Sequence, residues 1–171
     1  MIVRKGLLIG VPMLLASLLQ LTVLTRLGLP GATPDLVVVT VVAIALAMGP
    51  IEGAAAGFAG GILVDLSPSS DSVIGINAIL YVAIGFIVGY LIETRDRTTW
   101  STIVFSAFSC AAAALVSAVV DAMLGSPRII WEAVPVVTLT SALYGALLAR
   151  VVIPPIVWLV GKLASEALID A

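Results

Sequence analysis

Few side chains in this sequence of 171 residues could do chemistry, and most of those are carboxylates. The sequence contains no histidine, and Cys110 is its single cysteine. Without histidine, histidine-bound zinc and histidine-activated serine or cysteine nucleophiles are excluded. A single cysteine forms neither an intrachain disulfide nor a thiolate metal cluster. We therefore expect a protein that is not an enzyme and that binds no metal and no cofactor.

Three polar residues are candidates for a ligand pocket. Asp35 precedes an apolar segment, Asp65 ends the next one, and Asn77 begins a third. If these segment ends meet on the outer side of a membrane, the three side chains line a pocket that opens outward. Each residue also has an ordinary interpretation. Asp35 could cap the helix that follows it. Asp65 could be a solvated residue at a helix end, because charge near a membrane interface costs little. Asn77 and Gln20 within apolar helices typically join helices by hydrogen bonds.

Asp65 and Asp121 lie near the ends of apolar segments and could suggest an intramembrane aspartyl protease. That chemistry needs two carboxylates that share a proton at close range. No GxGD sequence precedes either residue, which argues against it.

The composition predicts one membrane domain, because 61% of the residues are hydrophobic and 11% are charged. Soluble domains carry roughly 25% charged residues. The first apolar segment has the roughly 20 residues that a bilayer core requires, whereas the second and third are short and need tilt or burial. Pro154 and Pro155 kink or stop the last helix, so the tail 154–168 either continues it or lies in the interface. The fold class predicted for residues 1–171 is an all-α bundle of six transmembrane helices, at about 6–25, 35–48, 51–66, 73–92, 99–124 and 132–153.

Small residues recur at a step of four along three of these segments, and residues four apart lie on one face of a helix. Glycine on such a face lets two helices in lipid approach closely. We therefore expect helix-packing or partner-binding faces at Gly49, Gly53, Gly57 and Gly61, at Gly85 and Gly89, and at Ser141 and Gly145.

Positively charged residues predict the orientation, since Lys and Arg concentrate on the cytoplasmic side. If the chain crosses the membrane six times with both termini in the cytoplasm, six of the positively charged residues lie inside and only Arg26 and Arg128 lie outside. A five-span alternative, with 35–66 as a re-entrant hairpin, places Arg150 and Lys162 outside and is therefore ranked second. No basic patch indicates nucleic acid. The six inner residues are Arg4, Lys5, Arg95, Arg97, Arg150 and Lys162.

The order of motifs in residues 1–95 resembles the rod shape-determining protein MreD family. The motifs are Pro34-Asp35, then Gly53-x3-Gly57-Phe58-x2-Gly61-x3-Asp65-Leu66, then Gly75-x-Asn77-Ala78. The resemblance implies a scaffold of cell elongation in the bacterial inner membrane. Its partners would be membrane lipid, the bitopic coiled-coil protein MreC and, indirectly, the actin-like MreB filament and the peptidoglycan polymerase–transpeptidase pair. The family is also similar in its six-helix layout to the substrate-binding subunits of energy-coupling-factor transporters.

Two other functions remain open. The chain could be the substrate-binding subunit of a vitamin uptake transporter, although it has no long outer loops and few aromatic residues to stack on a ring. Alternatively, a scaffold could retain a pocket at Asp35, Asp65 and Asn77 that accepts a lipid or a lipid-linked precursor head group.

Overall fold

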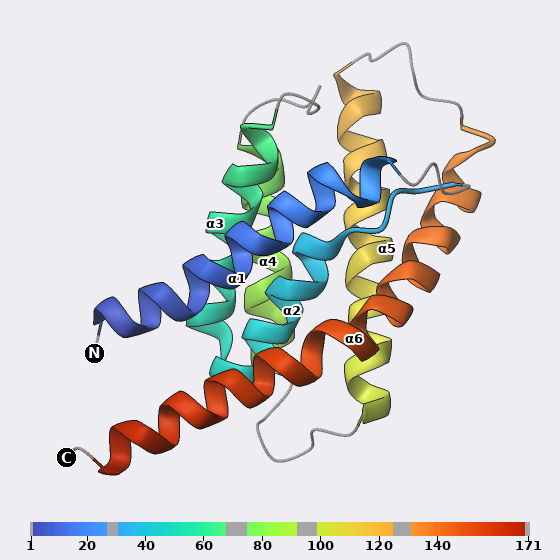
Figure 1. The fold of residues 1–171 in the computed structure, drawn as a ribbon. Helices are drawn as coiled ribbons and strands as arrows, with labels where there is room; N and C mark the ends of the chain where they lie inside the picture. Colours follow the sequence, from blue (N-terminus) through green and yellow to red (C-terminus); the bar gives the residue numbers. More distant parts are fainter. Residues whose placement is uncertain (1, 27–30, 68–74, 92–98, 125–130, 170–171) are drawn as a thin grey trace.

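The computed structural model describes residues 2–26, 31–67, 75–91, 99–124 and 131–169, which form six α-helices, one short 3-10 helix and no strand (Figure 1). The predicted all-α class is confirmed for these residues. The predicted helix ends at residues 73 and 92, and the charges Arg95, Arg97 and Arg128, lie outside them. The helices are α1 (Ile2–Thr22), η1 (Leu24–Arg26), α2 (Leu36–Met48), α3 (Pro50–Asp65), α4 (Ile76–Leu91), α5 (Thr99–Met123) and α6 (Val134–Ile169).

Two of the described helices are long and apolar enough to cross a membrane. They are the segments Trp100–Met123 of α5 and Val134–Lys162 of α6, and only 22% and 17% of an apolar 18-residue window in each is buried inside the bundle. Shorter apolar helices are found at Gly6–Thr22, Leu36–Met48 and Ile76–Leu91. Length and composition therefore support a helical membrane protein.

Helix α2 lies at the centre of the bundle and contacts each of the other five α-helices. Every residue from Leu36 to Leu46 is buried. A helix that is apolar on all sides is stable only when it is surrounded, and the run of Val, Ile and Ala meets that condition. The one polar residue in the run, Thr40, donates its hydroxyl hydrogen to the Leu36 carbonyl at 2.8 Å. Burial by its neighbours thus accounts for a central helix of only 13 residues.

Helices α3 and α4 pack with their backbones in contact, and they share the most extensive contact of any helix pair. A Cβ atom added at Gly57 would overlap the Tyr81 carbonyl, and one added at Gly85 would overlap the Gly53 carbonyl. A Cβ atom added at Gly61 would overlap the backbone of Ala78, and one added at Gly89 would overlap the backbone of Pro50. These glycines therefore join two helices of this chain. Gly49 instead lies in the turn between α2 and α3, with φ +105° and nothing within 4 Å of an added Cβ.

Helices α5 and α6 form a second close pair. A Cβ atom at Gly145 would lie 2.7 Å from Cys110 Sγ and 3.0 Å from the Ser106 carbonyl oxygen. Ser141 is buried one turn before Gly145. Both residues of this predicted face thus lie within the bundle.

Helix α6 continues through Pro154 and Pro155 to Ile169, so the tail continues the helix instead of ending at the prolines. Figure 1 shows the helix changing direction between its orange N-terminal part and its red C-terminal part. Proline bends a helix because it removes a backbone donor and its ring clashes with the preceding turn. The C-terminal part is thereby carried across α2, where Ile153 and Ile156 join the core.

Candidate functional site

Asp65 caps a helix other than its own. The residue ends α3 and is 5% exposed. Its Oδ2 atom accepts hydrogen bonds from the Gly75 N–H at 2.8 Å and the Ala78 N–H at 3.2 Å, and its Oδ1 atom accepts from Asn77 Nδ2 at 2.8 Å. The first N–H groups of α4 have no partner within that helix, and its N-terminus attracts negative charge. The Asp65 carboxylate therefore fixes the start of α4 to the end of α3.

Asp35 caps its own helix and connects it to α4. Its Oδ1 atom accepts from the Val38 N–H at 3.0 Å, and its Oδ2 atom accepts from the Tyr81 hydroxyl at 2.8 Å. The Gln20 side chain of α1 is a further hydrogen-bonding partner of this carboxylate, and its Oε1 atom accepts from the Val37 N–H at 3.0 Å. Asp35 thus joins three helices at one end of the bundle.

Tyr81 belongs to this network, although no sequence motif marks it. It lies four residues after Asn77 and four before Gly85, so the three residues share one face of α4. That spacing, on the face that meets α3, is the signal that could have identified it.

A cavity of about 320 Å³ lies between the segment that precedes α2, the C-terminal half of α5 and the start of α6. Asp35 lines it, whereas Asp65 and Asn77 do not. The structure therefore brings Asp65 and Asn77 together at the start of α4 and places Asp35 in a different setting. The residues that line the cavity are Ala32, Thr33, Asp35, Cys110, Ala113, Ala114, Ser117, Ala118, Asp121, Val137 and Ser141.

One face of α5 supplies the largest part of this cavity wall. Its lining positions 110, 113, 114, 117, 118 and 121 follow the three- and four-residue steps of a helix face, and most of them are small or polar. The segment opposite is held in place because the Ala32 N–H donates a hydrogen bond to Thr140 Oγ1 of α6 at 3.1 Å. Gly31 allows the close approach, with φ +88°. The spacing of small residues on α5 is the sequence signal for this cavity.

The cavity between Asp35 and Asp121 has no basic side chain in its lining. Two carboxylates, three hydroxyl groups and one thiol line it, and no histidine, lysine or arginine is among them. A serine or cysteine nucleophile needs an adjacent base such as histidine. Within the described ranges, no group of three or more His, Cys, Asp and Glu side chains could hold a metal ion.

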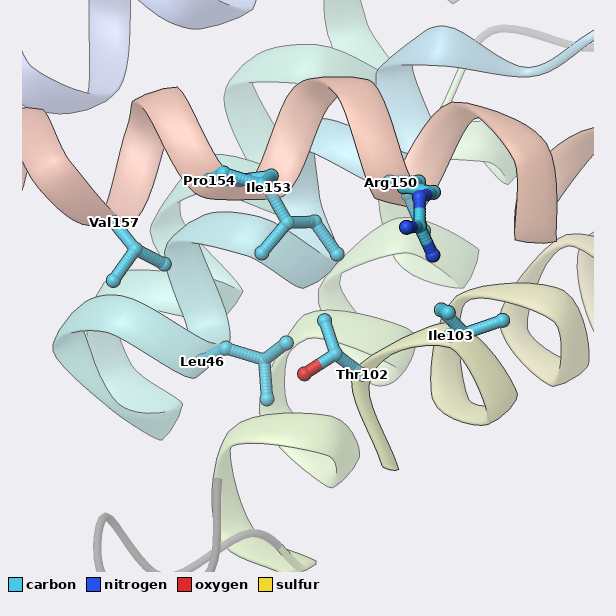
Figure 2. Close-up of a pocket in the computed structure, with 8 residues that line it drawn as sticks. Leu46, Thr102, Ile103, Arg150, Ile153, Pro154 and Val157 are labelled. Carbon is cyan, nitrogen blue, oxygen red and sulfur yellow. The ribbon is translucent and has the colours of Figure 1, made fainter. Parts of the chain in front are cut away.

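Arg150 lies in a separate cavity of about 230 Å³ where the end of α2, the start of α5 and the middle of α6 meet. Figure 2 shows its side chain pointing from α6 toward α5, with Ile103 beneath it and Ile153 and Pro154 on the next turn. Apart from Arg150 and Thr102 the lining is apolar. A long cationic side chain in such a place covers apolar surface with its stem and extends its charge toward an interface.

A third cavity, of about 370 Å³, is an apolar groove between α1 and α6 with Leu36 and Thr40 of α2 at its floor. Pro12 and Pro155 lie on its two sides.

Comparisons with protein-family models, with curated proteins and with solved structures find no match for this chain.

Proposed function

We propose that this protein is a non-enzymatic scaffold of the cell-elongation machinery in the bacterial inner membrane, in the manner of the MreD family. It holds an MreC-like bitopic protein and links the cytoskeletal filament to lateral peptidoglycan synthesis. The proposal is supported by the contacts that the motif residues make within the bundle. Asp35, Asp65, Asn77 and the α3 glycines at 53, 57 and 61 all hold one helix of the chain against another.

A rigid helical body with an apolar outer surface suits this function. Large hydrophobic side chains are exposed along α1, α5 and α6, which surround the buried α2. In lipid, such surfaces contact acyl chains or the transmembrane helices of partners, and close fit determines which partner stays. Examples are Leu14 and Leu18 of α1, Val104 and Phe108 of α5, and Leu143 and Leu147 of α6.

The proposed topology has six crossings with both termini in the cytoplasm. Figure 1 shows the start of α1 and the end of α6 on the same side of the bundle, which supports an even number of crossings. Helix α2 has 13 residues and spans roughly 20 Å at 1.5 Å per residue, less than a bilayer core of about 30 Å. Its burial among five helices removes the need to match that thickness, because lipid does not reach its backbone.

Depletion of this protein in its native host tests the function. We expect the cells to lose rod shape and to regain it with the wild-type chain or with Gly10→Leu, because nothing lies within 4 Å of a Cβ added at Gly10. Gly57→Leu should fail to restore shape, since the added side chain would separate α3 from α4. Depleted cells that grow as normal rods would contradict the scaffold function.

The cavity that Asp35 and Asp121 line favours one alternative, a substrate-binding subunit of a vitamin uptake transporter. A vitamin with a ring is usually held by aromatic stacking, and no aromatic residue is among those that line this cavity. The scaffold therefore remains the better supported function. Recovery of an ATPase pair with a coupling membrane subunit would reverse the ranking.

A further inference from the structure

We propose that the cavity between Asp35 and Asp121 binds the ammonium group of a small organic amine. The proposal concerns a binding site at one end of the bundle and does not depend on the scaffold function. It rests on the charge of the lining, on a buried serine hydroxyl group in the cavity wall, and on the small size of the wall residues.

The charge of the lining favours a cation in this cavity. Both charged residues that line the cavity are acidic, and they come from two different elements, the N-cap of α2 and the last turns of α5. Asp121 lies two residues before Met123, the end of α5, and that last turn contains no basic residue. A carboxylate there faces the negative end of the helix dipole, so a cation beside it gains from both charges. No described residue forms an ion pair with Asp121.

The wall also contains a hydroxyl group that is free to bind a ligand. Ser141 is 5% exposed and Cys110 is 1% exposed, and both line the cavity. No hydrogen bond joins the Ser141 hydroxyl to another described residue, so its oxygen is open to a ligand in the cavity that it lines. A ligand that donates hydrogen bonds would give this oxygen its partner.

The lining also defines the chemical class of the ligand. An ammonium group donates three hydrogen bonds and carries the charge that the two carboxylates favour. Ala113, Ala114 and Ala118 leave room beside it for methylene or methyl groups. Anionic head groups are disfavoured, because no lysine or arginine lines the cavity to offset repulsion by the acids. A divalent metal is disfavoured as well, because among the described residues no three acidic, cysteine or histidine side chains come together to hold one.

Charge-selective thiol labelling tests the site in the full-length protein in detergent. The chain has a single cysteine, so Cys110→Ala followed by Ser117→Cys places one thiol in the cavity wall, and Trp131→Cys in the same background gives an exposed reference. Cationic and anionic methanethiosulfonate reagents of similar size are compared. We expect the cationic reagent to be favoured at position 117 over position 131 by roughly tenfold. Equal or reversed ratios at the two positions would overturn the proposal.

Two further arms test the ligand and the carboxylate. Ethanolamine should slow labelling at position 117, whereas ethylene glycol, its neutral counterpart, and inorganic phosphate should not. Asp121→Asn should remove both the protection and the charge preference, and size-exclusion chromatography checks that this near-isosteric variant is folded. Protection by phosphate, or protection by ethanolamine no greater than by ethylene glycol, would overturn the proposal.

Discussion

Two glycine-to-alanine substitutions should change stability in opposite directions. Gly57→Ala adds a Cβ atom that overlaps the backbone carbonyl of Tyr81. Unlike a side chain, the backbone of a helix cannot relieve the overlap by changing rotamer. Helices α3 and α4 must then separate. Overpacking of this kind costs about 1–3 kcal/mol, and the better helix propensity of alanine returns about 0.5–1 kcal/mol. We expect a net loss of about 1–2 kcal/mol in the free energy of unfolding.

Gly10→Ala provides the matched control on α1. Nothing lies within 4 Å of a Cβ added there, so the substitution retains the propensity gain without the overlap. We expect it to raise the free energy of unfolding by about 0.5–1 kcal/mol. Equilibrium unfolding of the purified protein in mild detergent, followed by circular dichroism, measures both values. Equal effects of the two substitutions, or a Gly57→Ala variant as stable as wild type, would refute the assignment of the glycine face to α3–α4 packing.

Substitutions at three further positions test the polar contacts in the same unfolding assay. Asp65→Ala should lower the free energy of unfolding by about 2–3 kcal/mol, because the N–H groups at the start of α4 lose their acceptor. Asp65→Asn should lower it less, and equal losses for the two variants would contradict a capping carboxylate. Tyr81→Phe should cost about 1 kcal/mol through loss of the hydroxyl bond to Asp35, and a neutral effect would argue against that bond. Thr140→Val should cost about 1 kcal/mol and raise amide exchange at Ala32, whose N–H loses its acceptor; unchanged exchange would contradict the contact.

Much of the fold could be predicted from the sequence because apolar segments, prolines and glycines mark helix ends locally. The helix at residues 35–48 and its start after Asp35 follow from such local signals, and the structure has α2 at Leu36–Met48. The step of four among the α3 glycines also follows from the sequence, since it defines a face whatever lies opposite. What lies opposite does not follow, because the relative rotation of two helices depends on the whole bundle.

The candidate site was less predictable for the same reason. Asp35, Asp65 and Asn77 all lie at helix ends on one side of the bundle, which made a shared pocket a reasonable hypothesis. Their partners depend on how each helix is rotated in the bundle. Asp65 and Asn77 are turned toward each other, whereas Asp35 lines the cavity whose wall is formed mainly by α5. The path after Pro154 was open in the sequence, because a pair of prolines is compatible with either a bend or a stop. Packing of Ile156 into the core favours the bend.

Identification of the proteins that co-purify with the tagged chain from its native membrane, in mild detergent, tests the scaffold function most directly. We predict recovery of a bitopic protein with a periplasmic coiled coil, together with wall-synthesis enzymes, and reduced recovery with Gly57→Leu but not with Gly10→Leu. Recovery of an ATPase pair with a coupling membrane subunit, in place of these proteins, would contradict the scaffold function.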